Sequence, residues 1–279
     1  MATYKHFLVD TPAPYVAHVQ INRPKKLNAF FEEMWLELKV VFDTLSVSPD
    51  IRAIILSGAG DRAFTAGLDV QAASEAGVLK QQEGKTSDVA RKAVGIKRHV
   101  QEFQDCISSI EKCEKPVICV MHGIAFGLGL DISTCADIRI CTSDVRFSVK
   151  EVDIGLAADI GTLSRLPKVV GSFSWVKDVS LSARIFSGDE ALRVGFVSHV
   201  LENKEAALAK GLETAKLLAE KSPVAVQGTK ELLNHARDNK LADSLRYTGV
   251  WNSAAIQTSD VERAMLSGLK KTKPRFEKL

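Results

Sequence analysis

The chain has 279 residues, of which 46% are hydrophobic and 25% charged, and its mean hydropathy is +0.01. These values are typical of a globular protein and exclude a chain that is disordered, collagenous or coiled-coil throughout. The net charge of +3 argues against a dedicated nucleic-acid binder. No apolar run approaches the roughly 18 residues of a membrane span. Five cysteines without a C-x-x-C pair favour buried thiols over disulfides or a zinc site.

The first elements follow from hydrophobic periodicity. Alternating apolar and polar residues predict a strand over Val16–Ile21. Apolar residues at helical spacing then run to Leu45, and Asn28 is the expected N-cap of that helix. The apolar run Arg52–Leu56 predicts a buried strand.

The middle of the chain begins with Gln71–Val94, which is polar and weakly periodic. It predicts a mobile or variable segment that leads into a helix ending near Glu111. The next expected elements are a strand at Val117–Met121, a glycine-rich bend with a short helix, strands at Ile138–Cys141 and Val145–Val149, and a helix at Ile160–Leu166 that ends before Pro167.

In the last third of the chain the predicted secondary structure changes from mixed strands and helices to helices alone. A helix over Asp189–Arg193 and a strand over Phe196–Val200 are followed by helical patterns only. The expected helices are Lys204–Lys221, Pro223–Asp238, Leu241–Ile256 and Ser259–Leu269. The sequence therefore predicts an α/β core over residues 1–202 and a C-terminal helical region over residues 203–279.

Three carboxylates have apolar or glycine-rich neighbours. They are Asp131, Glu151 and Asp159. Desolvation raises the pKa of an acid in such surroundings, which makes it a usable proton donor or acceptor near neutral pH. Each of Asp131 and Asp159 also precedes a plausible helix, so an N-cap role is the alternative for these two. All three within a short stretch flanking a glycine bend favour a catalytic site.

Two turns that follow buried strands could supply backbone N–H donors. One is Phe64–Asp69 and the other is Gly127–Gly129. Glycine lets a backbone approach a ligand closely, and two such turns facing each other would form an oxyanion hole for a carbonyl oxygen. Taken singly, each pattern is also that of an ordinary turn.

At these residues the sequence resembles the enoyl-CoA hydratase/isomerase (crotonase) superfamily over nearly its whole length. The matching motifs are Asn22–Ala29 (NRPKKLNA), Ala63–Asp69 (AFTAGLD) and His122–Asp131 (HGIAFGLGLD). A fourth segment, Lys150–Lys168, is similar to the dienoyl-CoA isomerase branch. The resemblance implies a spiral of ββα units, with C-terminal helices that build homotrimers or homohexamers.

The resemblance also implies a reaction: isomerisation of 3,5-dienoyl-CoA to 2,4-dienoyl-CoA in β-oxidation of unsaturated fatty acids. Leu68 and Leu128 would bind the thioester oxygen through their N–H groups. Asp159 would take the C2 proton, Glu151 would deliver one to C6, and Asp131 would support the site. The expected substrate-binding and CoA-binding residues are Lys25, Lys26, Ala66, Gly67, Gly127, Gly129 and Lys270. No metal is expected, and no cofactor beyond the CoA of the substrate.

One departure from the family pattern is Leu128, which stands where a glycine is usual. A leucine supplies the same N–H only if its backbone angles are allowed. The alternatives are an enoyl-CoA hydratase, a 3,2-enoyl-CoA isomerase, or a non-catalytic acyl-CoA-binding paralogue. The ending Glu277-Lys-Leu279 is similar to a peroxisomal address, although a small residue is expected at Glu277. We expect the peroxisome, with mitochondrion or cytosol as alternatives.

Overall fold

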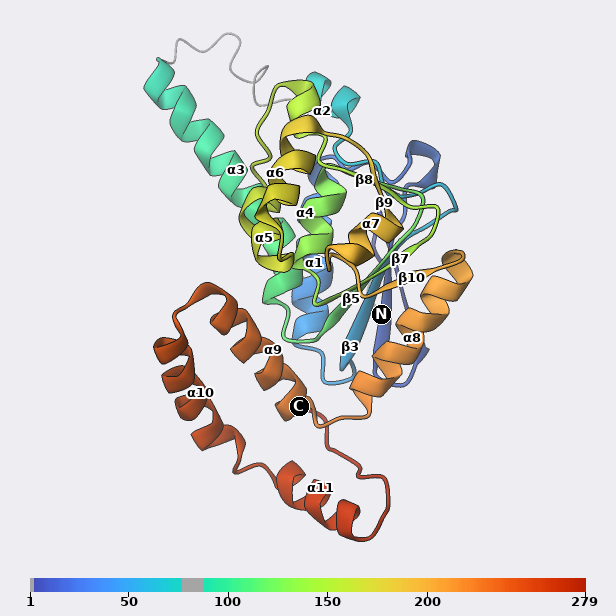
Figure 1. Ribbon diagram of the computed structural model, residues 1–279, viewed down its shortest axis with the longest axis vertical. Helices are drawn as coiled ribbons and strands as arrows, with labels where there is room; N and C mark the ends of the chain where they lie inside the picture. Colours follow the sequence, from blue (N-terminus) through green and yellow to red (C-terminus); the bar gives the residue numbers. More distant parts are fainter. Residues whose placement is uncertain (1–2, 77–87) are drawn as a thin grey trace.

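The computed structural model describes residues 3–76 and 88–279. Figure 1 shows a body built of sheets and helices, from which a set of helices extends. These helices are α9 (Pro223–Asp238), α10 (Leu241–Ala255) and α11 (Ser259–Leu269), which we call the C-terminal arm. After α11 the chain returns to the body, where the Arg52 guanidinium donates to the carbonyls of Phe276 and Glu277.

A six-stranded sheet forms the centre of the body, in the order β1-β2-β3-β5-β7-β10. Its strands are β1 (Phe7–Ala13), β2 (Val16–Ile21), β3 (Ala53–Gly58), β5 (Val117–Met121), β7 (Ile138–Thr142) and β10 (His199–Leu201). Only β1 and β2 pair antiparallel; the other neighbours are parallel. Every residue of β3 and β5 is buried, which explains why both read as continuous apolar runs.

A second sheet carries the loops that matter for function. It has four strands in the order β4-β6-β8-β9. These are β4 (Ala63–Thr65), β6 (Ile124–Phe126), β8 (Arg146–Ser148) and β9 (Phe186–Ser187). Each of the first three is only three residues long. Strands this short give little periodic signal, so β4, β6 and β9 were not expected from the sequence.

Helices cover both faces of the large sheet. Those of the body are α1 (Glu32–Ser46), α2 (Val70–Ala76), α3 (Val89–Lys112), α4 (Leu128–Cys135), α5 (Thr162–Val169), α6 (Phe173–Ser182), α7 (Gly188–Arg193) and α8 (Lys204–Ala219), with short 3-10 turns η1 (Pro24–Lys26) and η2 (Glu151–Ile154). The main core lies between the sheets and α1, α3 and α4. A smaller core lies under α8, where Ala207 and Ala215 pack on Ile55, Ile118 and Ile140.

Most of the expected elements are confirmed. The strand at Val117–Met121 and the helices at Pro223–Asp238 and Ser259–Leu269 have the predicted bounds. The mixed α/β fold with parallel sheets and a helical C-terminal region is confirmed as well. Of the predicted variable segment Gln71–Val94, residues 77–87 lie outside the described residues, and α3 follows as expected.

Several expectations are wrong, each for a local reason. Helix α1 is capped by Phe31, because Asn28 is fully buried in a left-handed conformation and serves another role. Pro167 lies inside α5 rather than after it. It is the sixth residue of that helix, so its ring falls beyond the first turn where proline is usually tolerated. The last strand starts at His199, because Phe196 is buried among the rings of Phe147 and Phe186.

No helix among the described residues is long and apolar enough to cross a membrane. The predicted division of the chain at residue 203 stays a prediction. Helix α8, which follows that boundary, packs closely on the sheet: a Cβ added to Gly211 would lie 3.0 Å from a methyl of Val120. The arm that follows α8 buries few of its side chains.

Candidate active site

The motifs Asn22–Ala29 and Ala63–Asp69 contact each other and together shape the loop that follows β4. The buried side chain of Asn28 donates to the carbonyls of Ala59 and Ala63, both at 2.9 Å, and accepts from the N–H of Arg23. The Arg23 guanidinium in turn binds the carboxylate of Asp69 at 2.7 Å. The segment around Asn28 therefore holds the loop after β4 in place, and this is the role that replaces the predicted helix cap.

The two candidate oxyanion loops lie side by side. Strands β4 and β6 are parallel neighbours, so the loops after them leave the sheet at the same edge. Gly67 has φ +94°, and a Cβ placed on it would lie 3.5 Å from the amide nitrogen of Leu128 and only 2.9 Å from the carbonyl oxygen of Phe126. Only a glycine fits this close approach.

The amides of Leu68 and Leu128 are both available as donors. Neither makes a hydrogen bond within residues 3–76 and 88–279. Leu128 is the first residue of α4, where backbone N–H groups have no partner inside the helix and the helix dipole favours negative charge. Gly127 takes the positive φ of 51°, so Leu128 keeps an ordinary helical backbone. The leucine therefore meets the condition that its N–H remain usable.

Asp131 lies in the first turn of α4 and is 2% exposed. One carboxylate oxygen accepts from the N–H of Thr162 at 2.6 Å and from its hydroxyl at 2.7 Å. Burial raises the pKa of this carboxyl to about 6, against the opposing effect of the two hydrogen bonds. The expected alternative of an N-cap is wrong, because Gly127 is the N-cap of α4. The Asp131 carboxylate instead accepts from the first N–H of the neighbouring helix α5.

Glu151 begins the 3-10 turn η2 and faces the same loop. One of its oxygens is buried without a hydrogen-bond partner. The other would lie 3.1 Å from a Cβ added to Gly127. Burial, followed by the charge of Asp131, raises the pKa of Glu151 to about 7. Such a carboxyl can give or take a proton near neutral pH.

Asp159 lies just before α5 and is half-buried. Its backbone carbonyl accepts from the side-chain amide of Gln104 on α3 at 2.5 Å. The charge of Asp159 raises the pKa of both Asp131 and Glu151, which places Asp159 near both of them. The N-cap alternative is wrong here too, since Gly161 caps α5. Asp131, Glu151 and Asp159 therefore lie near one another, and their role as a catalytic site stays a prediction.

The expected phosphate-binding lysines are not brought together within one chain. Lys25 and Lys26 form the exposed turn η1. Lys270 is the C-cap of α11, the last helix of the arm, which Figure 1 shows away from α4 and α5. Ala66 lies in the first loop with Gly67, and Gly129 packs its backbone against Thr65.

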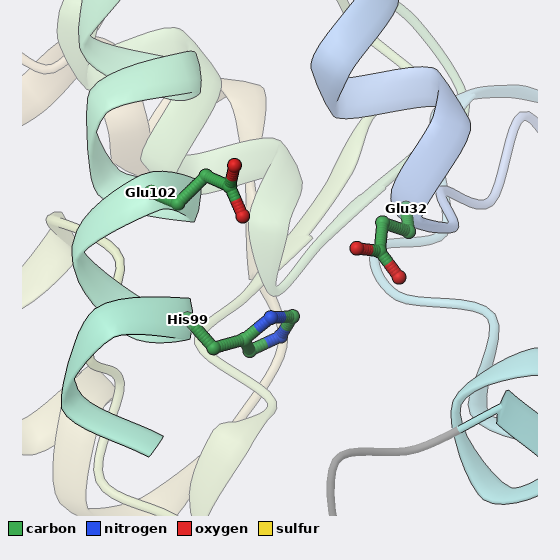
Figure 2. Close-up of side chains that lie close together, drawn as sticks. All are labelled: Glu32, His99 and Glu102. Carbon is green, nitrogen blue, oxygen red and sulfur yellow. The ribbon is translucent and has the colours of Figure 1, made fainter. Parts of the chain in front are cut away.

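Among residues 3–76 and 88–279, one group of side chains has the spacing to hold a cation. Figure 2 shows Glu32 of α1 facing His99 and Glu102 of α3, with ligand atoms that all lie within 4.8 Å of one another. Both glutamates are exposed, and exposed carboxylates commonly lie together without an ion. No further feature of the group points to an ion, so we assign no metal role to it.

Two residues of the site were missed by the sequence analysis. Thr162 holds Asp131, and Gln104 holds the backbone of Asp159. The Gly161–Thr162 start of α5 is a signal that could have indicated Thr162. Nothing in the sequence near Gln104 indicates its partner, which is 55 residues away.

Residues 13–278 match the family described as "Enoyl-CoA hydratase/isomerase". The chain belongs to the enoyl-CoA hydratase/isomerase family. Among its relatives, the mitochondrial Delta(3,5)-Delta(2,4)-dienoyl-CoA isomerase of Mus musculus is 42% identical, over 96% of this chain and 80% of the relative. The peroxisomal enzyme of that name from Arabidopsis thaliana is 40% identical, over 95% and 93%.

Other family members are more distant. The short-chain-enoyl-CoA hydratase of Clostridium acetobutylicum is 32% identical, over 92% of both chains. Among solved structures, a putative enoyl-CoA hydratase from Streptomyces coelicolor is similar with a TM-score of 0.86 at 27% identity, covering 99% of this chain and 96% of that one. The fold of the chain is therefore that of the family.

Proposed function

We propose that this protein isomerises 3,5-dienoyl-CoA to 2,4-dienoyl-CoA. The observation that carries the proposal is the presence of Glu151 and Asp159 as two separate carboxylates beside the paired loops of Leu68 and Leu128. Moving a proton between C2 and C6 requires groups at both ends of the conjugated chain. Relatives that are 40% to 43% identical and bear the dienoyl-CoA isomerase name support the same reaction.

In the proposed first step, the thioester oxygen accepts hydrogen bonds from the N–H groups of Leu68 and Leu128. Asp159 then removes a proton from C2, and the electrons move onto the thioester oxygen to give a dienolate. Donors aimed at the developing charge in a site without water stabilise it more than water would. The dipole of α4 adds to this effect because Leu128 is its first residue.

In the second step, Glu151 in its protonated form delivers a proton to C6, and the double bonds become those of the 2,4-diene. The raised pKa of Glu151, about 7, keeps a protonated fraction available near neutral pH. Exchange with solvent returns the proton to Glu151 and removes the one from Asp159. Asp131 keeps its place on Thr162 and supplies negative charge that favours protonated Glu151.

The remaining assignments belong to the same proposal. Lys25, Lys26 and Lys270 bind CoA phosphates, with Lys270 contributed across a homotrimer or homohexamer. No cofactor beyond the CoA of the substrate is required. We expect a peroxisomal location with the mitochondrion as the alternative, and the names of the relatives include both compartments.

The test is the ultraviolet absorbance on mixing the protein with 3,5-octadienoyl-CoA, which lacks the chromophore of the conjugated 2,4-dienoyl thioester. We expect a rapid rise that Asp159→Asn lowers by about 10²- to 10⁴-fold. Asp153→Asn is the matched control, because Asp153 lies on η2 and pairs only with Lys150 at the surface. No rise with the wild-type protein would contradict the proposal, and hydration of 2-enoyl-CoA would then be measured.

A further inference from the structure

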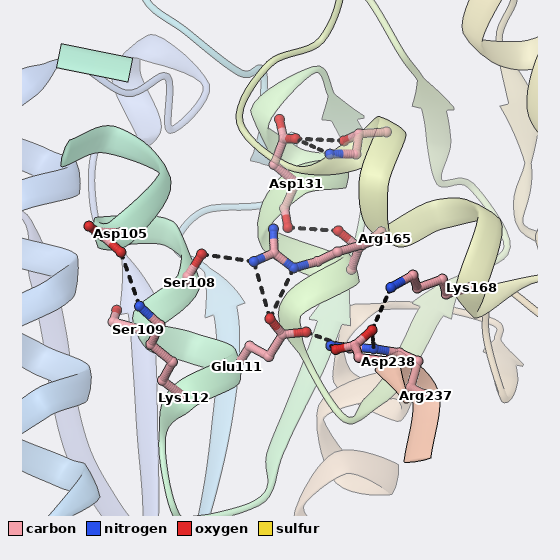
Figure 3. A network of polar contacts seen from close by, with 12 residues as sticks. Asp105, Ser108, Ser109, Glu111, Lys112, Asp131, Arg165, Lys168, Arg237 and Asp238 are labelled. Carbon is pink, nitrogen blue, oxygen red and sulfur yellow. Dashed lines mark hydrogen bonds and ion pairs between the residues drawn. The ribbon is translucent and has the colours of Figure 1, made fainter. Parts of the chain in front are cut away.

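A network of ion pairs between half-buried and exposed side chains lies close to Asp131 (Figure 3). Its centre is Glu111 near the end of α3, whose side chain is 17% exposed. One oxygen of Glu111 accepts from the Nε and Nη2 of Arg165 on α5, at 3.2 and 3.1 Å. The other accepts from Arg237 on α9 at 2.5 Å. One carboxylate therefore joins three helices, one of which belongs to the C-terminal arm.

Arg165 lies directly behind Asp131. Its guanidinium also donates to the hydroxyl of Ser108 at 2.8 Å, so α3 fixes it at two points. A Cβ added to Gly161 would lie 2.0 Å from an Arg165 nitrogen and 3.9 Å from the Asp131 carboxylate. The guanidinium thus lies over the first turn of α5, where the N–H and hydroxyl of Thr162 hold Asp131.

The outer end of the network fastens the arm. The Arg237 guanidinium binds the carboxylate of Asp238 at 2.7 Å, and that carboxylate also accepts from Lys168 of α5 at 2.5 Å. The end of α9 is therefore tied to α5 by two routes, one through Asp238 and Lys168 and one through Glu111 and Arg165. Nothing in the proposed mechanism uses these groups, although each is partly shielded from water.

We propose that Glu111 is a positioning residue that links the C-terminal arm to the active site, by holding Arg165 and thereby the first turn of α5 that orients Asp131. The effect of this link on catalysis rests on the proposed function, which assigns Asp131 its role. The hydrogen bonds that form the link do not depend on the proposed function. Small displacements of a catalytic group lower the rate strongly, up to about 10²-fold for 1 Å. Loss of Glu111 then affects the chemical step more than substrate binding.

The test compares Glu111→Gln with Glu190→Gln, a matched control. Glu190 is 20% exposed and also binds an arginine, Arg184, but in the region of α6 and α7. Glu111→Gln removes the carboxylate that pairs with Arg165, and Glu190→Gln removes one of the two carboxylates that pair with Arg184, the other being Asp178, so both changes lower the melting temperature. We expect only Glu111→Gln to lower kcat, by about 10-fold to 100-fold, with KM changed less than about twofold. Unchanged kcat in folded Glu111→Gln would overturn the link.

A double-mutant cycle that combines Glu111→Gln with Thr162→Val distinguishes a specific link through Thr162 from a general loss of stability. If Glu111 acts through Thr162 and Asp131, the double variant is little slower than the slower single variant. Rate losses that multiply would contradict the link. Arg237→Gln is the second variant should Glu111→Gln fail to fold, because it removes the ion pairs of Arg237 with Glu111 and with its neighbour Asp238 and keeps the pair of Glu111 with Arg165.

Amide hydrogen exchange gives a readout that needs no turnover. Amide protons in peptides that span Gly161–Arg165 should exchange about tenfold faster in Glu111→Gln than in the wild type. In Glu190→Gln their exchange rate should equal that of the wild type. Equal exchange in all three proteins would overturn the link even if the wild type showed no isomerase activity. Activity in the wild type with unchanged exchange and kcat in Glu111→Gln would contradict the link and leave the proposed function standing.

Discussion

The body and the C-terminal arm depart from the usual distribution of side chains in opposite ways. The body buries acids: Asp131 is almost fully enclosed, and Glu151 has a buried oxygen without a partner. The arm exposes large apolar side chains instead. These are Leu233, Leu241, Leu245, Val250, Ile256, Met265, Leu266 and Leu269. Helix α10 buries only Ser244, and α11 only Asp260, an acid whose carboxylate, unlike that of Glu151, has a partner in the Ser222 hydroxyl at 2.6 Å.

The two departures have different physical reasons. A buried carboxyl destabilises the fold but gains a pKa near neutrality, which proton transfer needs. Exposed apolar side chains cost a folded monomer little, and a helical region that carries many of them offers a surface for interaction. A cleft of about 1810 Å³ between arm and body adds to that surface. We therefore expect chemistry in the body and, as proposed, contacts between copies of the chain on the arm.

The largest fall in activity should come from replacing Glu151, the acid that has a buried oxygen without a hydrogen-bond partner. Glu151→Gln should lower kcat by about 10²- to 10⁴-fold, because the amide cannot deliver a proton to C6. Deuterium from solvent should still enter C2 through Asp159, as measured by mass spectrometry of recovered substrate. Deuterium at C6 of the product at the wild-type rate would contradict the role of Glu151, and with it the functional reason given for the buried acid.

The next prediction compares how much side-chain packing stabilises the body and the arm. Phe147→Ala should destabilise the protein by about 3–5 kcal/mol, because Phe147 is fully buried against Phe186 and Phe196 with ring centroids at 5.1 and 5.5 Å. Val250→Ala on the exposed face of α10 should change the free energy of unfolding by less than about 0.5 kcal/mol in a monomer. Chemical denaturation measures both. A large loss for Val250→Ala would show that the arm face is already covered in solution.

The pH dependence of stability tests the cost of the buried acid. The pKa of Glu151 rises from its ordinary 4.5 to about 7 on folding, so between these values the folded state holds the proton more tightly than the unfolded state. Stability from this group is full below about pH 4.5 and is lost as the pH rises through about 7. Glu151→Gln should therefore gain stability over the wild type across this range, by at most about 3 kcal/mol. A constant difference would contradict the raised pKa.

Substitutions on the exposed face of the arm should change the structure of a single chain least, and should act on its assembly instead. Replacing Leu241 and Leu245 together by lysine puts two charges on one face of α10, since they are one turn apart. We expect smaller assemblies by sedimentation velocity with little change in helix content. Leu181→Lys is the control, because Leu181 is 75% exposed on α6 in the body. A wild-type protein that sediments as a monomer would contradict the role of the arm.

Much of the site could be predicted because its residues lie in continuous motifs. The motif from His122 to Asp131 contains a strand end, the left-handed Gly127 and the start of α4 in one stretch. Glycines and apolar runs indicate such features without knowledge of the partners. Asn28 could not be interpreted in this way: its sequence position favours a cap, and only its contacts with Ala59 and Ala63 show that it joins two loops.

The sequence by itself determined the class of fold, the family and the three carboxylates, since local patterning and motif spacing encode each of them. The tertiary structure decided which groups face one another. Thr162 meets Asp131 from 31 positions away, and Arg237 meets Glu111 from 126 positions away. Such pairs depend on how α3, α4, α5 and α9 cross, and the side chains that set those crossings are spread over the whole chain. The raised pKa of Glu151 has the same origin, because burial is a property of the folded chain and not of the residues beside it.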